Sequence, residues 1–505
     1  MSEAPLLNSP LWLERADTSF PSLSGEVEVD VAVIGGGITG VTAAYLLKQA
    51  GKRVALLEMN RIGYGATGYT TAKLTVGHSL VYADLVRSYG AEAARLYARS
   101  NQEAVEQIVG IVREHSIQCD LEQTANYVYT ESADAARDLE GELEAARTAG
   151  IDAVLTTATD LPYPVAAAIK VEGQAQFHPW KYLAGLSQLI PGNGSHVFEL
   201  SRASAVSSGD PCVVQTAGGR VRAAHVIVAT QLPFLDRGLF FAKAHPTKSY
   251  VIAAGVDEAS APRDMYISVD QPSRSVRSTP AGDGTRMLIV GGEGHSMGAE
   301  TDARQRYERL ERFLAERFAT TATHRWSTHD YAPADKLPYI GRLRRNDAHI
   351  LVATGFAKWG MTKGTLAAAM LTDTVLGQAN PYAELYDATR LKPRHSAAEL
   401  GRRNVKVAEM FIRDRLRARP GATDIERLAP GEGTVARIAG KHYAVSRDES
   451  GALTTRSARC THLGCIVGWN AADRAWECPC HGSRFAADGT LIQGPATKDL
   501  PRAYW

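Results

Sequence analysis

The feature that most constrains the fold is a strand, a glycine-rich turn, a helix and a second strand in immediate succession. Residues 27–58 read VEVDVAVIGGGITGVTAAYLLKQAGKRVALLE. The apolar, β-branched run 29–34 predicts a strand buried on both faces. The helix that follows stops at Gly51, and the second strand ends in Glu58. This order predicts an α/β fold that begins with a parallel strand pair.

Three glycines in the spacing G-x-G-x-x-G, namely Gly35, Gly37 and Gly40, join the first strand to the helix. The first glycine turns the chain tightly, the second lets the backbone approach a pyrophosphate, and the third lets helix and strand pack closely. Glu58, 18 residues after Gly40, can accept a hydrogen bond from a ribose hydroxyl. Because all parts occur in order, a dinucleotide site is favoured over a plain glycine-rich turn.

The next segment, MNRIGYGATGYTTAKLT (residues 59–75), resembles the flavoprotein family of D-amino-acid, glycine and sarcosine oxidases. The resemblance implies FAD, with this loop running along the pyrophosphate and under the flavin. Lys73 stands where the family often has a small residue, so it is either a charged catalytic candidate facing the flavin or a solvated lysine. The small-residue pattern is matched by Gly65, Ala66, Thr67, Thr70 and Thr71.

Later motifs extend the resemblance in the family's order. AAHVIVATQ (223–231) is similar to a buried strand that ends under the cofactor, and Val206, just upstream, falls where a backbone contact to adenine is usual. DKLPYIGRL (335–343) matches a D-x-x-P-x-I-G turn, and residues 349–377 match a final strand, loop and helix. The helix near Met361 would direct its positive end at the flavin pyrimidine. The loop contributes the further expected cofactor contacts Gly355, Gly360, Met361 and Thr362.

A second glycine-rich stretch, MLIVGGEGHSMGAE (287–300), imitates a nucleotide turn. Gly292 and Gly294 are followed at the required third position by Met297, and no apolar strand ending in an acid comes after the next helix. The stretch is therefore interpreted as a strand and turn of the substrate domain rather than a nicotinamide site.

Substrate-contacting residues carry no sharp motif, because flavin amine oxidation needs a neutral amine and little acid–base help. The loop GFAKWGMTKG should lie beside the flavin, and its Lys358, Trp359 and Lys363 join Lys73 as catalytic candidates. Ordinary packing is the alternative for Trp359, and a solvated surface charge is the alternative for the lysines. Weaker candidates are Tyr250 and Tyr266, whereas His178 is expected to cap or pack against the helix that follows it.

Residues 390–419 are strongly basic, with ten Arg or Lys against three acids. Val405, Ala408, Ile412 and Leu416 form an apolar stripe at helical spacing. Such a helix could touch a membrane or an acidic partner. We favour a bridging helix docked on the protein, because the stripe lacks the tryptophans and bulk of a membrane binder.

Four of the six cysteines and two histidines lie between residues 460 and 481, inside a region of short strands that starts near residue 423. Two thiolates and two imidazoles from two loops can hold a [2Fe–2S] cluster. Zinc is the alternative metal, although C-x-H and C-x-x-H arms fit its usual spacing poorly. The four expected ligands are Cys460, His462, Cys478 and His481.

The two arms, CTHLGC and CPCHGS, resemble those of Rieske proteins. The resemblance implies a small all-β Rieske domain, a disulfide between Cys465 and Cys480, and a hydrogen bond from Ser483 to the cluster. Such bonds are one of the factors that set a cluster's potential. In a reducing compartment the disulfide would ordinarily be reduced, unless burial beside the cluster protects it.

Bulk properties narrow the remaining possibilities. A net charge of +1 over 505 residues gives no global field for nucleic acid or membrane. No run of 18 apolar residues and no secretory signal are found, so we expect a cytoplasmic protein without an integral membrane segment. Cys119 and Cys212 are expected to be buried structural cysteines.

Together these features predict an α/β FAD-binding domain with a Rossmann-like βαβ core of the GR2 type, an α+β substrate domain and an all-β Rieske domain. The predicted function is oxidation of an amine or amino acid by hydride transfer to FAD, with electrons passing through the [2Fe–2S] cluster to an external acceptor. Two alternatives stay open: electrons flow from a donor through the cluster to the flavin, or the chain is a non-enzymatic redox sensor. The expected boundaries are 1–89, 151–242 and 331–380 for FAD binding, 90–150 and 243–330 for the substrate cap, 381–422 for a basic linker, and 423–505 for the Rieske domain.

Overall fold

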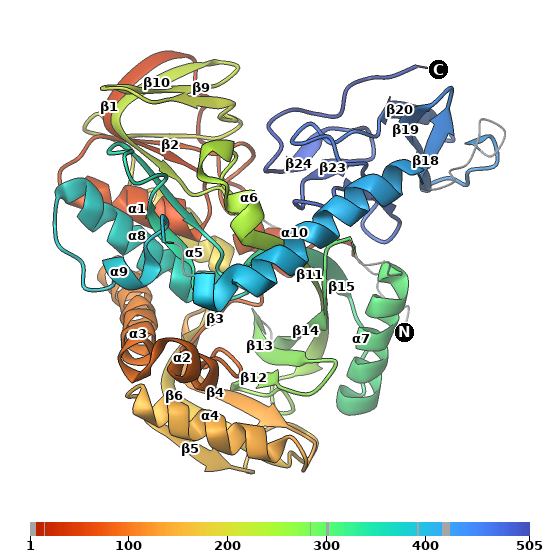
Figure 1. Ribbon diagram of the computed structural model, residues 1–505. Helices are drawn as coiled ribbons and strands as arrows, with labels where there is room; N and C mark the ends of the chain where they lie inside the picture. The colour runs from red at the N-terminus through yellow and green to blue at the C-terminus, as the bar shows by residue number, and fades with distance from the viewer. Residues whose placement is uncertain are drawn as a thin grey trace.

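The computed structural model describes residues 7–504 apart from 15, 283, 299–301, 391–392 and 417–424. Two sheets with their helices form a flavin module (residues 7–390), and a small C-terminal module (residues 425–504) lies beside it (Figure 1). Within the described residues, none of the helices combines the length and the apolar character needed to cross a bilayer.

The first sheet has eight strands, with β16-β17-β10-β1-β2-β7 as its main path and β9 and β8 extending it from β10. Strands β1, β2, β7, β10 and β17 run parallel, which confirms the strand pair predicted from the glycine motif. The bounds are β1 Gly25–Ile34, β2 Val54–Leu57, β7 His196–Phe198, β8 Ala205–Ser207, β9 Cys212–Gln215, β10 Gly219–Val228, β16 Tyr339–Arg342 and β17 Ile350–Thr354.

Helices cover this sheet and enclose its core. Helix α1 packs on α8, and α8 also packs on α3, so the helix that follows the glycine motif lies beside the one that closes the module. His178 is the N-cap of α5 and accepts from the Lys181 amide at 3.3 Å, as predicted. The bounds are α1 Ile38–Gln49, α2 Tyr82–Tyr89, α3 Ala91–Glu114, α5 Pro179–Ser187, α6 Phe240–Lys243, α8 Gly360–Leu376 and α9 Ala383–Tyr386, with short 3₁₀ turns at η1 Leu11–Leu13, η2 Ala66–Tyr69 and η3 Asp236–Gly238.

The second sheet has nine strands in the order β15-β11-β14-β13-β12-β4-β6-β3, with β5 beside β6. Helix α4 follows β4, and α7 packs against β11 and β14. The bounds are β3 Lys73–Leu74, β4 Glu122–Thr130, β5 Ala153–Thr156, β6 Ala167–Gln176, β11 Ala244–Asp257, β12 Met265–Ser268, β13 Arg274–Gly282, β14 Thr285–Ser296, β15 His324–Pro333, α4 Ala136–Thr148 and α7 Ala303–Phe318.

Strand pairing departs from the predicted boundaries at three strands. Strand β3 was placed with the FAD-binding segment 1–89, and β5 and β6 with the segment 151–242, but all three pair in the second sheet. Backbone hydrogen bonding of β6 to β4 brings them there, and no local pattern predicts that long-range pairing. Strand β14, which holds Gly292 and Gly294, runs antiparallel to β11 and β13, so the second glycine-rich stretch is a sheet strand, as interpreted.

The C-terminal module is all-β in two small sheets, as predicted. Strands β18, β19 and β20 form one, and β21 to β24 form the other. The bounds are β18 Gly433–Ile438, β19 Lys441–Arg447, β20 Leu453–Ser457, β21 Gly468–Asn470, β22 Ala475–Glu477, β23 Arg484–Ala486 and β24 Leu491–Gln493.

Helix α10 (Pro393–Leu416) crosses between the two modules, running from α6 toward β18 (Figure 1). It contacts both modules: Asn404 donates to the Ala242 carbonyl, and Arg415 donates to the Gly464 carbonyl. The predicted apolar stripe faces solvent rather than the protein: Val405 and Ile412 are each 58% exposed. The helix bridges as expected, but through polar groups, Val407 and Met410 rather than through that stripe. Residues 391–392 and 417–422 of the predicted linker, and the side chain of Leu416, lie outside the described residues.

Candidate functional site

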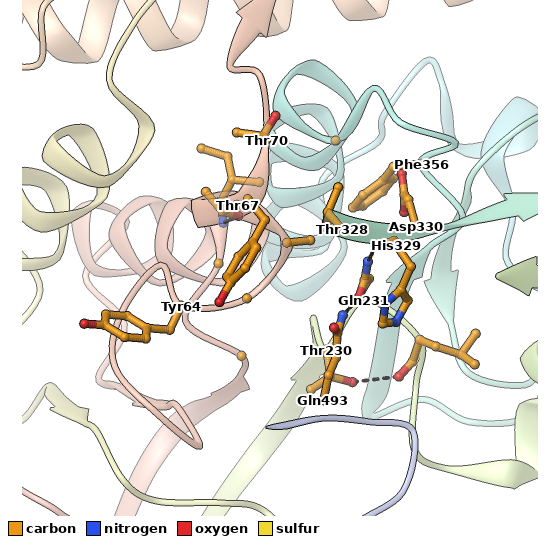
Figure 2. A pocket seen from close by; sticks show the side chains of 18 of the residues that line it. Tyr64, Thr67, Thr70, Thr230, Gln231, Thr328, His329, Asp330, Phe356 and Gln493 are labelled. Carbon is orange, nitrogen blue, oxygen red and sulfur yellow. Dashed lines mark hydrogen bonds between the residues drawn. The ribbon is translucent and has the colours of Figure 1, made fainter. Parts of the chain in front are cut away.

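One large cavity, with a volume of about 460 Å³, opens between the two sheets of the flavin module. The carboxyl ends of β1, β2 and β10 form one wall, β11, β14 and β15 form another, and the C-terminal module closes a third side. Figure 2 shows Tyr64, Thr67 and Thr70 on one side, and His329 and Asp330 on the opposite side, with Gln493 reaching in from the C-terminal module. Residues of both modules therefore form the walls of the cavity.

The glycine turn has the geometry expected of a dinucleotide site. A Cβ on Gly40 would lie 1.8 Å from the Gly35 carbonyl oxygen, so the helix and strand could not pack as they do with any side chain there. The buried Glu58 carboxylate accepts from the Gly36 amide at 2.6 Å and from the Asn60 amide at 2.8 Å. Burial raises the pKa of Glu58, while these amide bonds oppose the rise.

Two helices begin at this cavity. Their N-cap residues, Gly37 before α1 and Trp359 before α8, supply no side-chain capping hydrogen bond, although the Ile38 amide at the start of α1 donates to the Thr67 hydroxyl at 3.0 Å. The residues around both helix starts line the cavity. Unpaired N–H groups and the helix dipole favour anionic groups at such positions. A diphosphate and a reduced flavin ring both match this polarity, so the donor set fits FAD.

Lys73, on β3, lines the cavity although it is only 6% exposed. Its ammonium group donates to the Tyr266 carbonyl. Burial, with the charge of Arg277, lowers the pKa of Lys73 well below its ordinary value. Of the two readings left open by the sequence, the solvated lysine is excluded.

Lys358 and Trp359 also line the cavity, just before α8. A Cβ on Gly294 would lie 2.6 Å from the Lys358 Nζ, so this glycine leaves room for the lysine. Burial lowers the pKa of Lys358, and the charge of Asp330 opposes that effect. Trp359 stacks on His78 with ring centroids 4.4 Å apart, which combines the packing and cavity roles expected of it.

Most of the predicted flavin contacts line the cavity, and a smaller set does not. Those that line it are Gly35, Gly37, Glu58, Gly65, Ala66, Thr67, Thr70, Thr71, Gly360 and Met361, with Tyr250 from the weaker candidates. Those outside the lining are Gly40, Val206, Gly355, Thr362, Lys363 and Tyr266. Gly40 acts in packing instead, and Gly355 (φ +80°) leaves no space for a side chain beside Pro333.

Val206 buries its side chain in the core of the first sheet, and the cavity lining nearby includes Arg202 and Ala203. The expected backbone contact of Val206 to adenine stays a prediction. Lys363 is 2% exposed and lies one turn into α8, where its ammonium donates to the Phe356 carbonyl at 3.1 Å. Burial lowers the pKa of Lys363 to about 7, against the charge of Asp330. Lys363 therefore lies behind the cavity wall.

The four predicted cluster ligands meet at one end of the C-terminal module. Cys460 and Cys478 are buried and unpaired, and the rings of His462 and His481 lie 5.0 Å apart. The Nδ1 atoms of both histidines are buried without a hydrogen-bond partner. Because buried polar atoms are normally paired, two orphaned imidazole nitrogens beside two thiols fit a [2Fe–2S] cluster with mixed ligation.

Cys465 and Cys480 form a disulfide next to these ligands. The sulfurs of Cys465, Cys478 and Cys480 all lie within 4.8 Å of one another, so the disulfide ties the two ligand loops together beside the cluster site. The hydrogen bond with the Cys478 thiol is the main cause that lowers the pKa of Cys460, and the Ser483 hydroxyl makes a smaller contribution in the same direction.

Both histidine ligands face the flavin module rather than solvent. His462 Nε2 lies 2.9 Å from Asp236 Oδ1, and its side chain is 4% exposed. The ring of Phe241 lies 5.3 Å from that of His481. The Tyr331 hydroxyl, on β15, donates to the His481 carbonyl at 2.8 Å. The edge of the cluster site is thus buried between the modules.

The cluster loop passes close to the cavity wall at Gly482. A Cβ on Gly482 (φ +76°) would lie 3.0 Å from the Tyr331 hydroxyl and 3.3 Å from Cδ2 of His329. His329 lines the cavity, and its Nε2 is buried without a partner. Burial, with the charges of Arg484 and Lys248, lowers the pKa of His329 well below its ordinary value. A neutral ring therefore separates the cavity from the loop that carries His481.

A buried ion network holds the two modules together. Lys248 on β11, 2% exposed, lies 2.6 Å from Asp473 and also pairs with Glu477. Arg484 lies 3.3 Å from each of these acids and lines the cavity. Burial alone would raise the pKa of Asp473, but Lys248 and Arg484 outweigh it and lower that pKa.

Several cavity residues were not predicted from the sequence. His329 and Asp330 lie in HRWSTHDYAPADKLPY, directly before the recognised D-x-x-P-x-I-G turn, and Arg484 directly follows CPCHGS. Proximity to those motifs was the only available signal. Gln231 ends the segment AAHVIVATQ that was expected to lie under the cofactor, whereas residues 491–497 carried no signal, because they reach the cavity only when the modules dock.

Comparison with known proteins agrees with this geometry. A family model described as FAD dependent oxidoreductase matches residues 30–374, and a Rieske [2Fe-2S] domain model matches residues 422–503. The Rieske 2Fe-2S iron-sulfur protein YhfW of Bacillus subtilis (strain 168) is 38% identical over 496 residues, covering 97% of this chain and 96% of that protein.

Two further similarities cover the flavin module. Gamma-glutamylputrescine oxidoreductase of Escherichia coli (strain K12) is 26% identical over 415 residues, covering 79% of this chain and 95% of that protein. The crystal structure of glycine oxidase from Geobacillus kaustophilus superposes with a TM-score of 0.60 at 20% identity, covering 72% of this chain and 100% of that one. This last likeness establishes the fold.

Proposed function

Because the chain belongs to the DAO family of FAD-dependent oxidoreductases and ends in a Rieske [2Fe-2S] domain, we propose that it is a dehydrogenase for a small amine or amino acid. When bound, FAD takes the hydride from the carbon that bears the nitrogen, leaving an imine for water to hydrolyse, and the cluster carries the electrons singly toward an external acceptor. The relative called gamma-glutamylputrescine oxidoreductase supports an amine as the substrate class.

One observation above all supports electron exit through the cluster. A Cβ added at Gly482 would lie 3.3 Å from Cδ2 of the cavity residue His329, so the cluster loop passes close to the cavity wall, and both histidine ligands are buried against the flavin module. A mobile carrier would be expected to expose its histidine edge. This arrangement favours direct transfer inside one molecule.

In the proposal, Lys73 removes a proton from the substrate ammonium group. Its lowered pKa makes the neutral lysine available to accept a proton from the substrate ammonium at Nζ, which yields the neutral amine that oxidation requires. Lys358, which also lines the cavity and lies beside Asp330, would bind an anionic group of the substrate, such as a carboxylate.

An anaerobic screen of amines and amino acids tests the function, with the flavin absorbance and the electron paramagnetic resonance (EPR) signal of the reduced cluster followed together. We expect at least one amine to bleach the flavin and then produce the cluster signal. Flavin bleaching without cluster reduction would contradict the exit route. A product that gains an oxygen atom only in air would instead support electron flow from cluster to flavin.

With that amine, Lys73→Met should slow flavin reduction by about 10²–10⁴-fold, the usual range for losing a general base. The loss should shrink as pH rises, because more substrate is then already neutral. The exposed Lys441→Met, in the C-terminal module, is the matched control and should leave the rate unchanged. A Lys73→Met loss that stays constant across pH would exclude the proton-accepting role.

A further inference from the structure

The Rieske domain contributes a wall to the FAD cavity. Besides Arg484, the closing segment (residues 491–497) lines the cavity along its whole length. This segment comprises β24 and the turn after it. No other part of the C-terminal module reaches the cavity among the described residues.

The closing segment is fastened to the nucleotide side of the flavin module. The Gln493 side-chain amide donates to Oε1 of Gln231, and Nε2 of Gln231 donates to the His329 carbonyl (Figure 2). Just beyond the segment, Asp499 accepts from Arg202 at 3.1 Å. Met59, the neighbour of the ribose-binding candidate Glu58, packs against the core of the Rieske domain.

The same stretch is fastened to both cluster loops. The Ala496 amide donates to the Ser483 hydroxyl at 3.0 Å, two residues after the ligand His481. The Thr461 hydroxyl, between the ligands Cys460 and His462, donates to the Lys498 carbonyl at 2.6 Å. Each ligand loop therefore holds one point of the stretch that closes the FAD cavity.

We propose that cluster binding and FAD binding are coupled through the closing segment, so that the loaded Rieske domain retains FAD and loss of the cluster releases it. Iron ligation fixes the two loops, and their hydrogen bonds to Ala496 and Lys498 then fix the wall. Two ligands that favour the same ordered state bind cooperatively, and the coupling is reciprocal. The chain would thus become a competent flavoprotein only after its cluster is assembled.

The test measures FAD dissociation by the fluorescence of released FAD, in protein whose cluster has been removed by anaerobic iron chelation. We expect the FAD dissociation constant to rise by about 5–150-fold, the usual range for coupled sites. It should return to its original value when ferrous iron and sulfide rebuild the cluster. An FAD dissociation constant that changes by less than about twofold on cluster removal would overturn the coupling. No substrate is needed, so a failed amine screen would not affect this result.

A pair of substitutions distinguishes the loss of these two hydrogen bonds from unfolding of the Rieske domain. The double change Thr461→Val and Ser483→Ala should weaken FAD binding while iron content and the Rieske EPR signal show that the cluster remains. Thr454→Val with Ser450→Ala, on and beside β20 and away from the cavity lining, is the matched control and should bind FAD normally. If cluster removal releases FAD but the first double variant binds it as tightly as the control, the route through these two bonds is wrong.

Discussion

The two cofactor sites are built in opposite ways. The cluster site takes its four ligands from a short stretch, Cys460 to His481, on two adjacent loops tied by a disulfide. The FAD cavity gathers its walls from Ile34 to Thr497, across two sheets and two modules. A site made of neighbouring residues is visible in the sequence, whereas a site assembled by docking depends on contacts that no local pattern records.

Removing one ligand should have the largest effect, because the neighbouring sulfurs of Cys465 and Cys480 are held in a disulfide and cannot replace it. Cys478→Ala should abolish the cluster, measured as loss of bound iron and of the Rieske EPR signal. Cys212→Ala, a change at a buried cysteine in the core of the first sheet, is the control and should keep both. Full iron occupancy in Cys478→Ala would show that another residue serves as a ligand.

The FAD cavity, which forms where the two modules dock, should instead depend on the ion network between the modules. Lys248→Met leaves Asp473 and Glu477 buried with only Arg484 to balance them. Breaking such a pair typically costs about 3–5 kcal/mol. We expect Lys248→Met to lower the free energy of unfolding by this amount. Urea unfolding measures it, with the visible circular dichroism of the cluster as the signal.

The exposed pair Arg304–Glu432 also joins the modules, so Arg304→Met is a matched control. Its expected loss is below about 1 kcal/mol, because solvent screens an exposed pair. Equal losses in the two variants would mean that burial of the network does not hold the modules together.

A substitution in the glycine turn, at the nucleotide end of the cavity, should have a smaller effect on stability. Gly40→Ala places a Cβ against the Gly35 carbonyl, and the resulting overpacking should cost about 1–3 kcal/mol with loss of bound FAD. Gly110→Ala, in α3 with open space around it, should stabilise that helix by about 1 kcal/mol. FAD content and thermal unfolding distinguish the two, and normal FAD content in Gly40→Ala would contradict the packing role.

The smallest expected effect is a pH dependence at Lys363. Its folded pKa of about 7 lies below the ordinary 10.5, so between these values the unfolded chain binds more protons and stability rises with pH. The stability gain of Lys363→Met over the wild type should therefore shrink by about 1 kcal/mol per pH unit between pH 8 and 10. A gain that does not change with pH would mean that Lys363 stays charged in the fold.

Sequence reasoning succeeded where chemistry is local. The glycines, Glu58 and the two cysteine–histidine arms were predicted because each motif fixes its own backbone. It failed where pairing is distant: β5 and β6 joined the second sheet, and Lys363 lies behind the cavity wall rather than on it. The closing segment could not have been predicted, since its role exists only through bonds to Gln231 and Ser483 from other parts of the chain.

The central claim, that flavin and cluster work as one centre, has a direct test that needs no substrate. The flavin is reduced anaerobically by light with an external photosensitiser, and the Rieske signal is followed at several protein concentrations. We predict cluster reduction at a first-order rate that does not depend on dilution. A cluster that stays oxidised, or a rate that rises with protein concentration, would contradict it.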